Sequence, residues 1–390
     1  MTRTVYLDYN ATTPVEPQVL ETMMPYLQGE FGNPSSVYSL GLRAKKAIGK
    51  AREQVADLLG SSPQEITFTS GGSEANSMIM MGIPLQRRPK NGHVITSSIE
   101  HPAILRACEF LAAYHGYEIT YLPVNASGVV DVEDVRLALR PETVLVTVMM
   151  VNNEVGSIQP IREIGELCRE RQIHFHCDAV QAVGRLPVDV SELNVDSLSL
   201  SAHKIYGPKG VGALYLRHGI EVLPLIHGGG QEGGIRSGTE NVSGIVGLGM
   251  AAELAGQRMT ELHQRMDELR ALFLSQLRER KIDFTQNGDL ASCYPSTLNL
   301  LFTGLRGEAL AAMLNQMGIS VSIASACSAT STKLSHVLLA MGKSVDEIRG
   351  SVRFSMGYLT TEDDVMHAVD LLAQLAGRLR EMSSVPTRQN

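Results

Sequence analysis

The sequence has no tryptophan, few aromatic residues and only five cysteines, and each shortage narrows what the chain can be. The cysteines form no C-x-x-C pair and are odd in number, which argues against a disulfide framework and indicates reduced thiols. Positive charge is also in deficit, because the formal net charge is -7 at pH 7. We therefore expect no basic surface for direct binding of nucleic acid.

Long apolar runs are missing as well. The longest, residues 143–151, is too short to span a bilayer, and residues 1–14 contain no apolar segment flanked by basic residues. We therefore expect no signal peptide, no contact with a membrane and a cytoplasmic location. What the chain does have is a globular composition, with 44% hydrophobic and 19% charged residues over 390 positions. That length predicts a large domain and a smaller one.

Short β-branched runs alternate with helical stretches between residues 60 and 216. This alternation predicts an α/β fold with βαβ units and a mainly parallel sheet. The predicted strands are residues 66–70, 93–98, 118–124, 144–150, 173–179, 197–201 and 211–216. Ligands of such sheets lie beyond the carboxyl ends of the strands, so the residues just after each run are the candidates for a site.

A long helical segment follows the glycine-rich residues 227–241 and changes the character of the chain. Short strands near 296–302 and 319–323 and helices near 306–317, 333–341 and 361–381 come after it, which is typical of a smaller α+β domain. The predicted large domain covers residues 15–255, and the predicted small domain combines residues 1–14 and 256–390. The apolar residues that recur at helical spacing in the long segment are Leu262, Met266, Leu269, Phe273 and Leu277.

One of the predicted strands, SLSLS at 197–201, runs directly into Lys204. Leu198 and Leu200 alternate with serines, which predicts a strand that is buried on one face only. A lysine at the end of a strand is usually solvated. A partly desolvated lysine has a lowered pKa instead, and its amine can form a Schiff base with a carbonyl cofactor. Lys204 by itself does not decide between these interpretations.

Other strand ends also carry polar residues. Gly71 and Gly72 precede a predicted helix, an arrangement that suits a phosphate but is equally typical of an ordinary capped turn. His101 stands before another helix, and Asn153 belongs to a polar cluster after residues 144–150. Isolated residues of this kind are more often structural than catalytic.

The strand at 173–179 places His174, His176 and Asp178 on one face and Cys177 on the other. A metal site is one interpretation, although no third ligand follows nearby in the sequence. In the other interpretation, Asp178 is an anion that keeps a ring nitrogen protonated, and Gln181 is a neighbouring hydrogen-bond donor.

Together, the lysine after a strand, the aspartate on the preceding strand, the Gly-Gly-Ser turn and the histidine before a helix resemble the fold-type I enzymes that use pyridoxal 5'-phosphate. More narrowly, the chain resembles the cysteine desulfurases of the NifS/IscS type in the class V aminotransferase family. The resemblance implies a seven-stranded, mainly parallel sheet in the large domain, a small domain that carries a catalytic cysteine, and a homodimer. The similar stretches lie between residues 6 and 357 and are YLDYNATTPV, FGNPSSVYSLG, FTSGGSEAN, EHPAI, VNNEVGSIQPI, HCDAVQAVG, SAHKIYGPKGVGALY, GGGQEGGIRSGTEN, ASACSAT and SVRFSMG.

The resemblance also implies a role for individual residues. It makes Lys204 the Schiff-base lysine, Asp178 the partner of the pyridine nitrogen and His101 the ring stacked on the cofactor. The other implied cofactor contacts are Gly72, Ser73, Ser201, His203 and Thr239 of the partner subunit at the phosphate, and Asn153 and Gln181 at the phenolic oxygen.

The implied substrate contacts are Arg353 and Asn33, which would clamp the carboxylate of L-cysteine; a planar guanidinium suits this task. Cys327 lies in a run of small residues without apolar periodicity, which is typical of an accessible loop. The resemblance makes Cys327 the residue that receives sulfur as a persulfide. The remaining cysteines are interpreted as buried structural thiols, namely Cys108, Cys168, Cys177 and Cys293.

The implied activity is the conversion of L-cysteine to L-alanine, with sulfur passed to a protein acceptor or scaffold. Delivery could serve iron-sulfur cluster assembly, thiolation of transfer RNA or sulfur modification of DNA, and the sequence does not choose among them. Two alternatives stay open. One is a selenocysteine lyase or another β-eliminating enzyme of the same fold, and the other is a non-catalytic sulfur-relay scaffold, against which the presence of both Lys204 and Asp178 argues.

Overall fold

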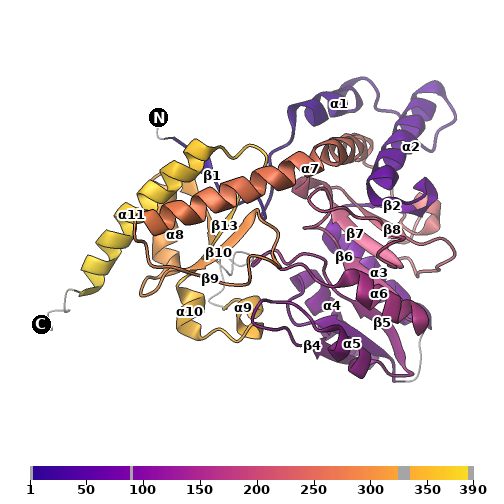
Figure 1. Cartoon of the computed structure of the whole chain (residues 1–390). Helices are drawn as coiled ribbons and strands as arrows, with labels where there is room; N and C mark the ends of the chain where they lie inside the picture. The colour runs from indigo at the N-terminus through magenta and orange to yellow at the C-terminus, as the bar shows by residue number, and fades with distance from the viewer. Residues whose placement is uncertain (1–2, 88–90, 324–333, 385–390) are drawn as a thin grey trace, which may run out of the picture.

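A computed structural model of the chain describes residues 3–87, 91–323 and 334–384. The described residues form a seven-stranded sheet of order β2-β8-β7-β6-β5-β3-β4, a four-stranded sheet of order β12-β13-β10-β9 and a two-stranded pair of β1 and β11 (Figure 1). The strands of the large sheet are β2 (Ile66–Thr69), β3 (His93–Ser97), β4 (Glu118–Leu122), β5 (Thr143–Thr147), β6 (His174–Asp178), β7 (Ser197–Ser201) and β8 (Gly212–Leu216).

The large sheet confirms the predicted α/β architecture, and each of the seven predicted strands forms. Strand β8 runs antiparallel to its neighbours β2 and β7, and the pairs among the other strands are parallel. As a result, β2, β3, β5, β6 and β7 all present their carboxyl ends at the same edge of the sheet.

Helices cover both faces of this sheet. Apolar residues of α2, α6 and the first part of α7 pack on the face that carries Phe175, Cys177, Leu198 and Leu200. Helices α3 and α4 pack on the opposite face, against Leu145 among others. The helices of the large domain are α1 (Pro17–Gln28), α2 (Ser39–Leu59), α3 (Gly72–Arg87), α4 (Pro102–His115), α5 (Val132–Ala138) and α6 (Ile161–Glu170).

The prediction that residues 197–201 are buried on one face only was wrong. All five residues of β7 are buried, and the serines face the side of the sheet that α3 covers. The hydroxyls of Ser197 and Ser199 can be buried because they bond to other side chains, namely His176 of β6 and Asn76 of α3.

The smaller domain is built on a second apolar core. That core combines Val5 and Leu7 with the second half of α7, the four-stranded sheet and α11. Helix α7 (Val242–Glu279) runs from one core to the other (Figure 1), so the predicted boundary near residue 255 falls inside a continuous helix. The other elements are β1 (Val5–Tyr6), β9 (Thr285–Gln286), β10 (Thr297–Leu301), β11 (Ile319–Ser320), β12 (Ser322–Ile323), β13 (Ser351–Ser355), α8 (Gly307–Gln316), α9 (His336–Ala340), α10 (Val345–Arg349) and α11 (Glu362–Ser384).

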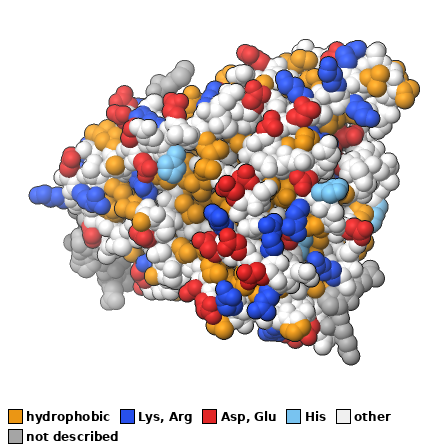
Figure 2. All heavy atoms as spheres, turned by 45° about the vertical axis from the view of Figure 1, so that its right-hand side comes forward, with side chains coloured by type: hydrophobic (Ala, Val, Ile, Leu, Met, Phe, Trp, Pro, Cys, Tyr) orange, Lys and Arg blue, Asp and Glu red, His pale blue; other side chains and the backbone are white. Residues whose placement is uncertain are grey.

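The surface carries charge of both signs. Figure 2 shows acidic and basic side chains interspersed over one face of the molecule. Among the described residues, no helix combines the length and the apolar character needed to cross a membrane.

Candidate active site

An open cleft of about 940 Å³ lies at the carboxyl ends of the large sheet's strands. Its wall combines residues from both sides of the sheet edge with Asn10 and Ala11 of the N-terminal segment and Arg353 of β13. The predicted residues that line it are Gly72, Ser73, His101, Asn153, Asp178, Gln181, Ser201, His203, Lys204 and Arg353. These residues are spread from position 72 to position 353, and the fold brings them together in one cleft.

Lys204 ends a short 3-10 turn, Ala202–Lys204, that follows β7 directly. The side chain is partly buried. Its Nζ donates to the carbonyl oxygen of Ala11 at 2.8 Å and to that of Asn10. Two backbone carbonyls therefore hold the amine at the wall of the cleft, where a bound carbonyl group could meet it.

Asp178 is the last residue of β6 and is 4% exposed. The backbone N–H of Val180 donates to Oδ1 at 3.0 Å, and the side-chain amide of Asn76 donates to Oδ2 at 2.7 Å. Each carboxylate oxygen thus accepts one hydrogen bond, which fixes the orientation of the buried carboxylate.

His101 caps the N-terminus of α4, where Pro102 takes the first helical position. Its Nδ1 accepts the backbone N–H of Ala103 at 3.1 Å. Burial lowers the pKa of His101, and the nearby positive charge of Lys204 acts in the same direction. The neutral ring therefore carries its proton on Nε2, because Nδ1 is used as an acceptor.

A polar hollow at the start of α3 adjoins the cleft. Backbone N–H groups at the first turn of a helix have no partner within the helix and suit a phosphate. A Cβ at Gly72 would lie 2.5 Å from Cγ2 of Val180, so a side chain at this position would force Val180 to move. His203 also lines the hollow, with Nδ1 at 3.1 Å from Oγ1 of Thr12, and burial lowers the pKa of His203 to about 4.

Arg353 is held by two partners, Asp8 and Asn153. The sequence had not predicted that either residue contacts Arg353. Its Nη2 lies 2.7 Å from Oδ1 of Asp8, and its Nη1 donates to the carbonyl oxygen of Asn153 at 2.9 Å. Arg353 is 4% exposed, and the carboxylate of Asp8 pairs with its buried charge. Asp8 lies in YLDYNATTPV, one of the stretches that carry the family resemblance, but the resemblance assigned it no role.

Asn10 is a second residue that was missed. Its carbonyl oxygen accepts from Lys204 and from the side-chain amide of Gln181 at 2.9 Å. Its own amide donates to the carbonyl oxygen of Asn153 at 3.1 Å, and its Oδ1 accepts from Arg185 at 2.8 Å. The N-terminal segment therefore fixes the relative positions of the groups that line the cleft.

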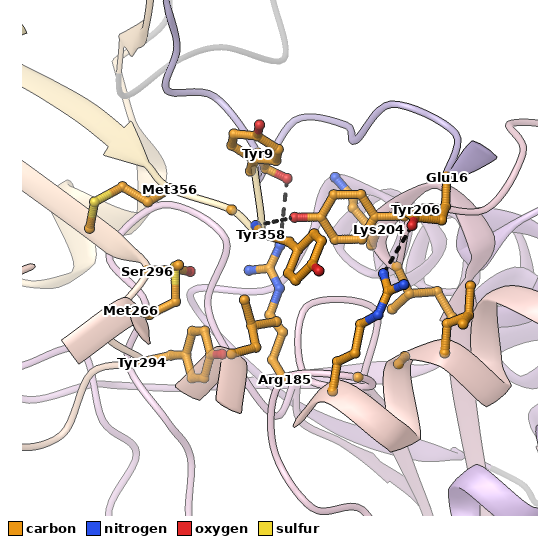
Figure 3. Close-up of a pocket in the computed structure, with 17 residues that line it drawn as sticks. Tyr9, Glu16, Arg185, Lys204, Tyr206, Met266, Tyr294, Ser296, Met356 and Tyr358 are labelled. Carbon is orange, nitrogen blue, oxygen red and sulfur yellow. Dashed lines mark hydrogen bonds and ion pairs between the residues drawn. The ribbon is translucent and has the colours of Figure 1, made fainter. Parts of the chain in front are cut away.

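A second cavity, of about 610 Å³, lies on the other side of Lys204 (Figure 3). Several tyrosines face it, and burial raises the pKa of Tyr206 and raises that of Tyr294 to about 12. Two of its polar contacts are internal, because Glu16 pairs with Arg258 at 3.1 Å and the backbone N–H of Tyr358 donates to Tyr206 at 2.6 Å. Lys204 lines both cavities, but the other predicted residues of the first cleft, including Asp178, His101 and Arg353, do not line the second.

Two described residues of the predicted site, Asn33 and Thr239, do not line the cleft in this chain. Cys327 lies outside the described residues. Asn33 is exposed between α1 and α2, where its side chain accepts the N–H of Ser35 at 2.9 Å, and Thr239 is exposed in the glycine-rich segment. Their roles stay predictions, and that of Thr239 requires a second copy of the chain.

The four described cysteines are all buried. Burial raises the pKa of Cys108 and Cys168 to about 12, raises that of Cys293 to about 11, and also raises that of Cys177. Thiols in these positions are poor nucleophiles, as their structural interpretation requires.

Comparison with known proteins identifies the family. The model of the aminotransferase class-V family matches residues 5–367. The chain belongs to this family. The chain is 46% identical to a cysteine desulfurase IscS of Dictyoglomus turgidum, over 98% of this chain and 97% of the relative.

Solved structures agree with this placement in the class-V family. A structure described as a NifS-like protein superposes with a TM-score of 0.91 at 38% identity, over 97% of this chain and all of the other. A structure of SspA in complex with cysteine superposes with a TM-score of 0.82 at 40% identity, over 92% of this chain and all of the other. The sequence-based assignment to class V and to the fold of the NifS-like proteins is therefore confirmed.

Proposed function

We propose that this class-V protein is a pyridoxal-phosphate-dependent cysteine desulfurase, which converts L-cysteine to L-alanine and keeps the sulfur as a protein persulfide. The observation that carries the proposal is the meeting of Lys204, Asp178 and Arg353 in one cleft of a chain that is 46% identical to a cysteine desulfurase IscS. An amine, a buried anion and a guanidinium are the groups that a carbonyl cofactor and an amino-acid substrate need.

The residues of the cleft fit pyridoxal phosphate. The start of α3 with Gly72 offers backbone N–H groups for a phosphate, and Asp178 offers a buried anion for a ring nitrogen. Gln181 is buried, and its Oε1 has no hydrogen-bond partner among the described residues, as a side chain facing a bound molecule would. When bound, the cofactor supplies an aldehyde that joins an amine and a ring that withdraws electrons from the adjacent carbon.

In this arrangement the chain's own groups bind, orient and move protons. Arg353 binds the substrate carboxylate through its planar fork. Lys204 holds the cofactor and, as an amine, removes the proton from Cα of the substrate. Asp178 stays ionised and keeps the ring nitrogen protonated, and His101 moves a proton at the substrate thiol through Nε2.

Cys327 is the proposed sulfur acceptor. Its thiolate attacks the sulfur of the substrate, the Cβ–S bond breaks with its electron pair left on carbon, and the carbon skeleton takes up protons to become alanine. The product on the protein is a persulfide on Cys327. High thiol pKa values at the buried cysteines support this choice, because they leave Cys327 as the remaining cysteine of the chain.

The proposal includes a homodimer acting in the cytoplasm. Exposed apolar side chains gather on α1, on the segment after it and at the start of α2, and a second copy could cover them. Asn33 lies in the same segment, and Thr239 would complete the phosphate site of the partner subunit. The exposed apolar residues are Leu20, Met24, Leu27, Phe31, Val37, Tyr38 and Leu42.

Product analysis distinguishes the functions. Purified protein is loaded with pyridoxal phosphate and given ¹³C-labelled L-cysteine or L-selenocysteine. A desulfurase produces labelled alanine and a protein persulfide from cysteine. A β-eliminating enzyme produces pyruvate and ammonia, a selenocysteine lyase acts on selenocysteine alone, and a relay scaffold produces neither product. Capture of proteins bound to the persulfidated form then identifies the sulfur acceptor among iron-sulfur, transfer RNA or DNA modification systems.

A further inference from the structure

A chain of buried side chains leads away from Asp178 on the face of the sheet that α3 covers. Asn76 of α3 bonds to Asp178, His176 to Asn76, Ser197 to His176, and His174 to Ser197. The four distances are 2.7 Å, 3.0 Å, 2.9 Å and 2.8 Å. These residues are between 0% and 4% exposed, so water does not compete for the bonds.

The order of donors along this chain is fixed by chemistry. An ionised carboxylate only accepts, so the amide nitrogen of Asn76 faces Asp178 and its Oδ1 faces the other way. Nε2 of His176 must then donate to that Oδ1, where the hydroxyl of Ser199 also bonds, at 2.5 Å. Burial lowers the pKa of His176 to about 3, so the ring is neutral and its Nδ1 is an acceptor.

The donors and acceptors at the far end of this row of hydrogen bonds, at Ser197 and His174, follow from the same reasoning. The single hydroxyl proton of Ser197 goes to Nδ1 of His176, so Nε2 of His174 donates to Ser197. Nδ1 of the neutral His174 is left as an acceptor, and it is buried without a partner among the described residues. Every donor in the chain therefore points toward the carboxylate.

We propose that Asn76 and His176 are positioning residues that keep Asp178 ionised and oriented toward a bound cofactor's ring nitrogen. Asn76 delivers the donor, and His176 prevents the amide of Asn76 from turning its oxygen toward Asp178. Nε2 of His174 and both ring nitrogens of His176 are thus engaged in hydrogen bonds with other side chains. This inference rests on the proposed role of Asp178.

Pyridoxal phosphate labelled with ¹⁵N in its ring tests the inference, because the ¹⁵N chemical shift reports directly whether the ring nitrogen is protonated. In the loaded wild-type protein, the ring nitrogen of the cofactor should stay protonated from pH 6 to 9. In Asn76→Leu and His176→Leu, the pKa of the ring nitrogen should fall by about one to two pH units, the value of one lost hydrogen bond to a charged group. The near-isosteric His176→Gln keeps a donor and should restore most of the wild-type value.

His93→Leu is the matched control, because it removes a buried histidine of β3 whose bonds go to Thr143 and Thr120 and not to Asp178. It should leave the ring signal unchanged. Asp178→Asn separates the proposed role of Asp178 from the positioning roles of Asn76 and His176. If Asp178→Asn lowers the pKa of the ring nitrogen but folded, loaded Asn76→Leu and His176→Leu do not, the positioning roles are wrong. If Asp178→Asn itself has no effect, the proposed role of Asp178 is wrong.

Discussion

Asp8 and Arg353 stand 345 positions apart in the chain, yet Oδ1 of Asp8 lies 2.7 Å from Nη2 of Arg353 at the edge of the cleft. The pair joins the N-terminal segment to β13 and leaves the guanidinium facing the cleft. Arg353→Lys keeps the charge but loses the fork, so it should raise the KM for cysteine about 10- to 100-fold while the spectrum of bound cofactor stays the same.

Asp8→Ala is the companion to this test. It leaves Arg353 buried without its counter-charge, so the midpoint of thermal unfolding should fall by several degrees, whereas Arg353→Lys should change it less. Steady-state kinetics and thermal unfolding measure the two effects separately. An unchanged KM in Arg353→Lys would remove Arg353 from the substrate site.

His101 caps helix α4 and is also proposed to move a proton at the substrate thiol. Substitutions can separate these two roles. His101→Ala removes the cap of α4 and the imidazole together, so it should lose about 1 kcal/mol of stability as well as most of kcat. His101→Asn supplies a good cap without an imidazole. It should recover the stability but not kcat. Recovery of both would mean that His101 serves only to cap the helix.

The buried carboxyl group of Glu100 should make the free energy of unfolding depend on pH. Its Oε1 accepts from Ser97 at 2.5 Å and from the N–H of Met149 at 2.8 Å, and burial raises the pKa of Glu100 to about 8. The folded protein therefore holds a proton that the unfolded chain releases above its ordinary pKa of 4.5. Stability from this group should be complete below about pH 4.5 and should be lost as the pH rises through about 8.

Glu100→Gln mimics the protonated acid and does not titrate. Its thermal midpoint should therefore gain on the wild type between pH 5 and pH 8, measured at constant ionic strength. Parallel curves for the two proteins over this range would show that Glu100 is already ionised in the fold.

Cys327→Ser separates cofactor chemistry from sulfur transfer. The variant keeps Lys204, Asp178 and Arg353, so it should bind pyridoxal phosphate and change its spectrum when cysteine is added. Alanine release should then fall steeply, since a serine hydroxyl is far less ionised than a thiol and cannot carry a persulfide. A persulfide found by mass spectrometry on Cys108, Cys168, Cys177 or Cys293, with Cys327→Ser fully active, would contradict the proposed role of Cys327.

The seven strands of the large sheet could be predicted because each is a short apolar or β-branched run bounded by turn residues. The polar groups at their ends followed from the rule that such sheets bind ligands there, and Lys204 and Asp178 do line one cleft. Local patterns identify these residues because strand and site are adjacent in the sequence.

Partners that come from distant parts of the chain could not be predicted in this way. Asp8 and Asn10 reach the cleft through contacts with β13, Asn153 and Lys204, and no local pattern encodes those contacts. The serines of β7 were expected to face solvent because alternation shows which residues share a face but not what covers that face. Their burial depends on Asn76 and His176, which lie more than a hundred and about twenty positions away respectively.

The central claim is that Lys204 in this cleft makes the protein a cysteine desulfurase, and single-turnover formation of alanine tests it most directly. Wild-type protein loaded with pyridoxal phosphate is mixed with ¹³C-labelled L-cysteine, and labelled alanine is counted per protein chain. We expect alanine from the wild type and from the control Lys46→Ala, which alters an exposed lysine of α2. We expect none above background from Lys204→Ala, and equal alanine from Lys204→Ala and the wild type would contradict the account.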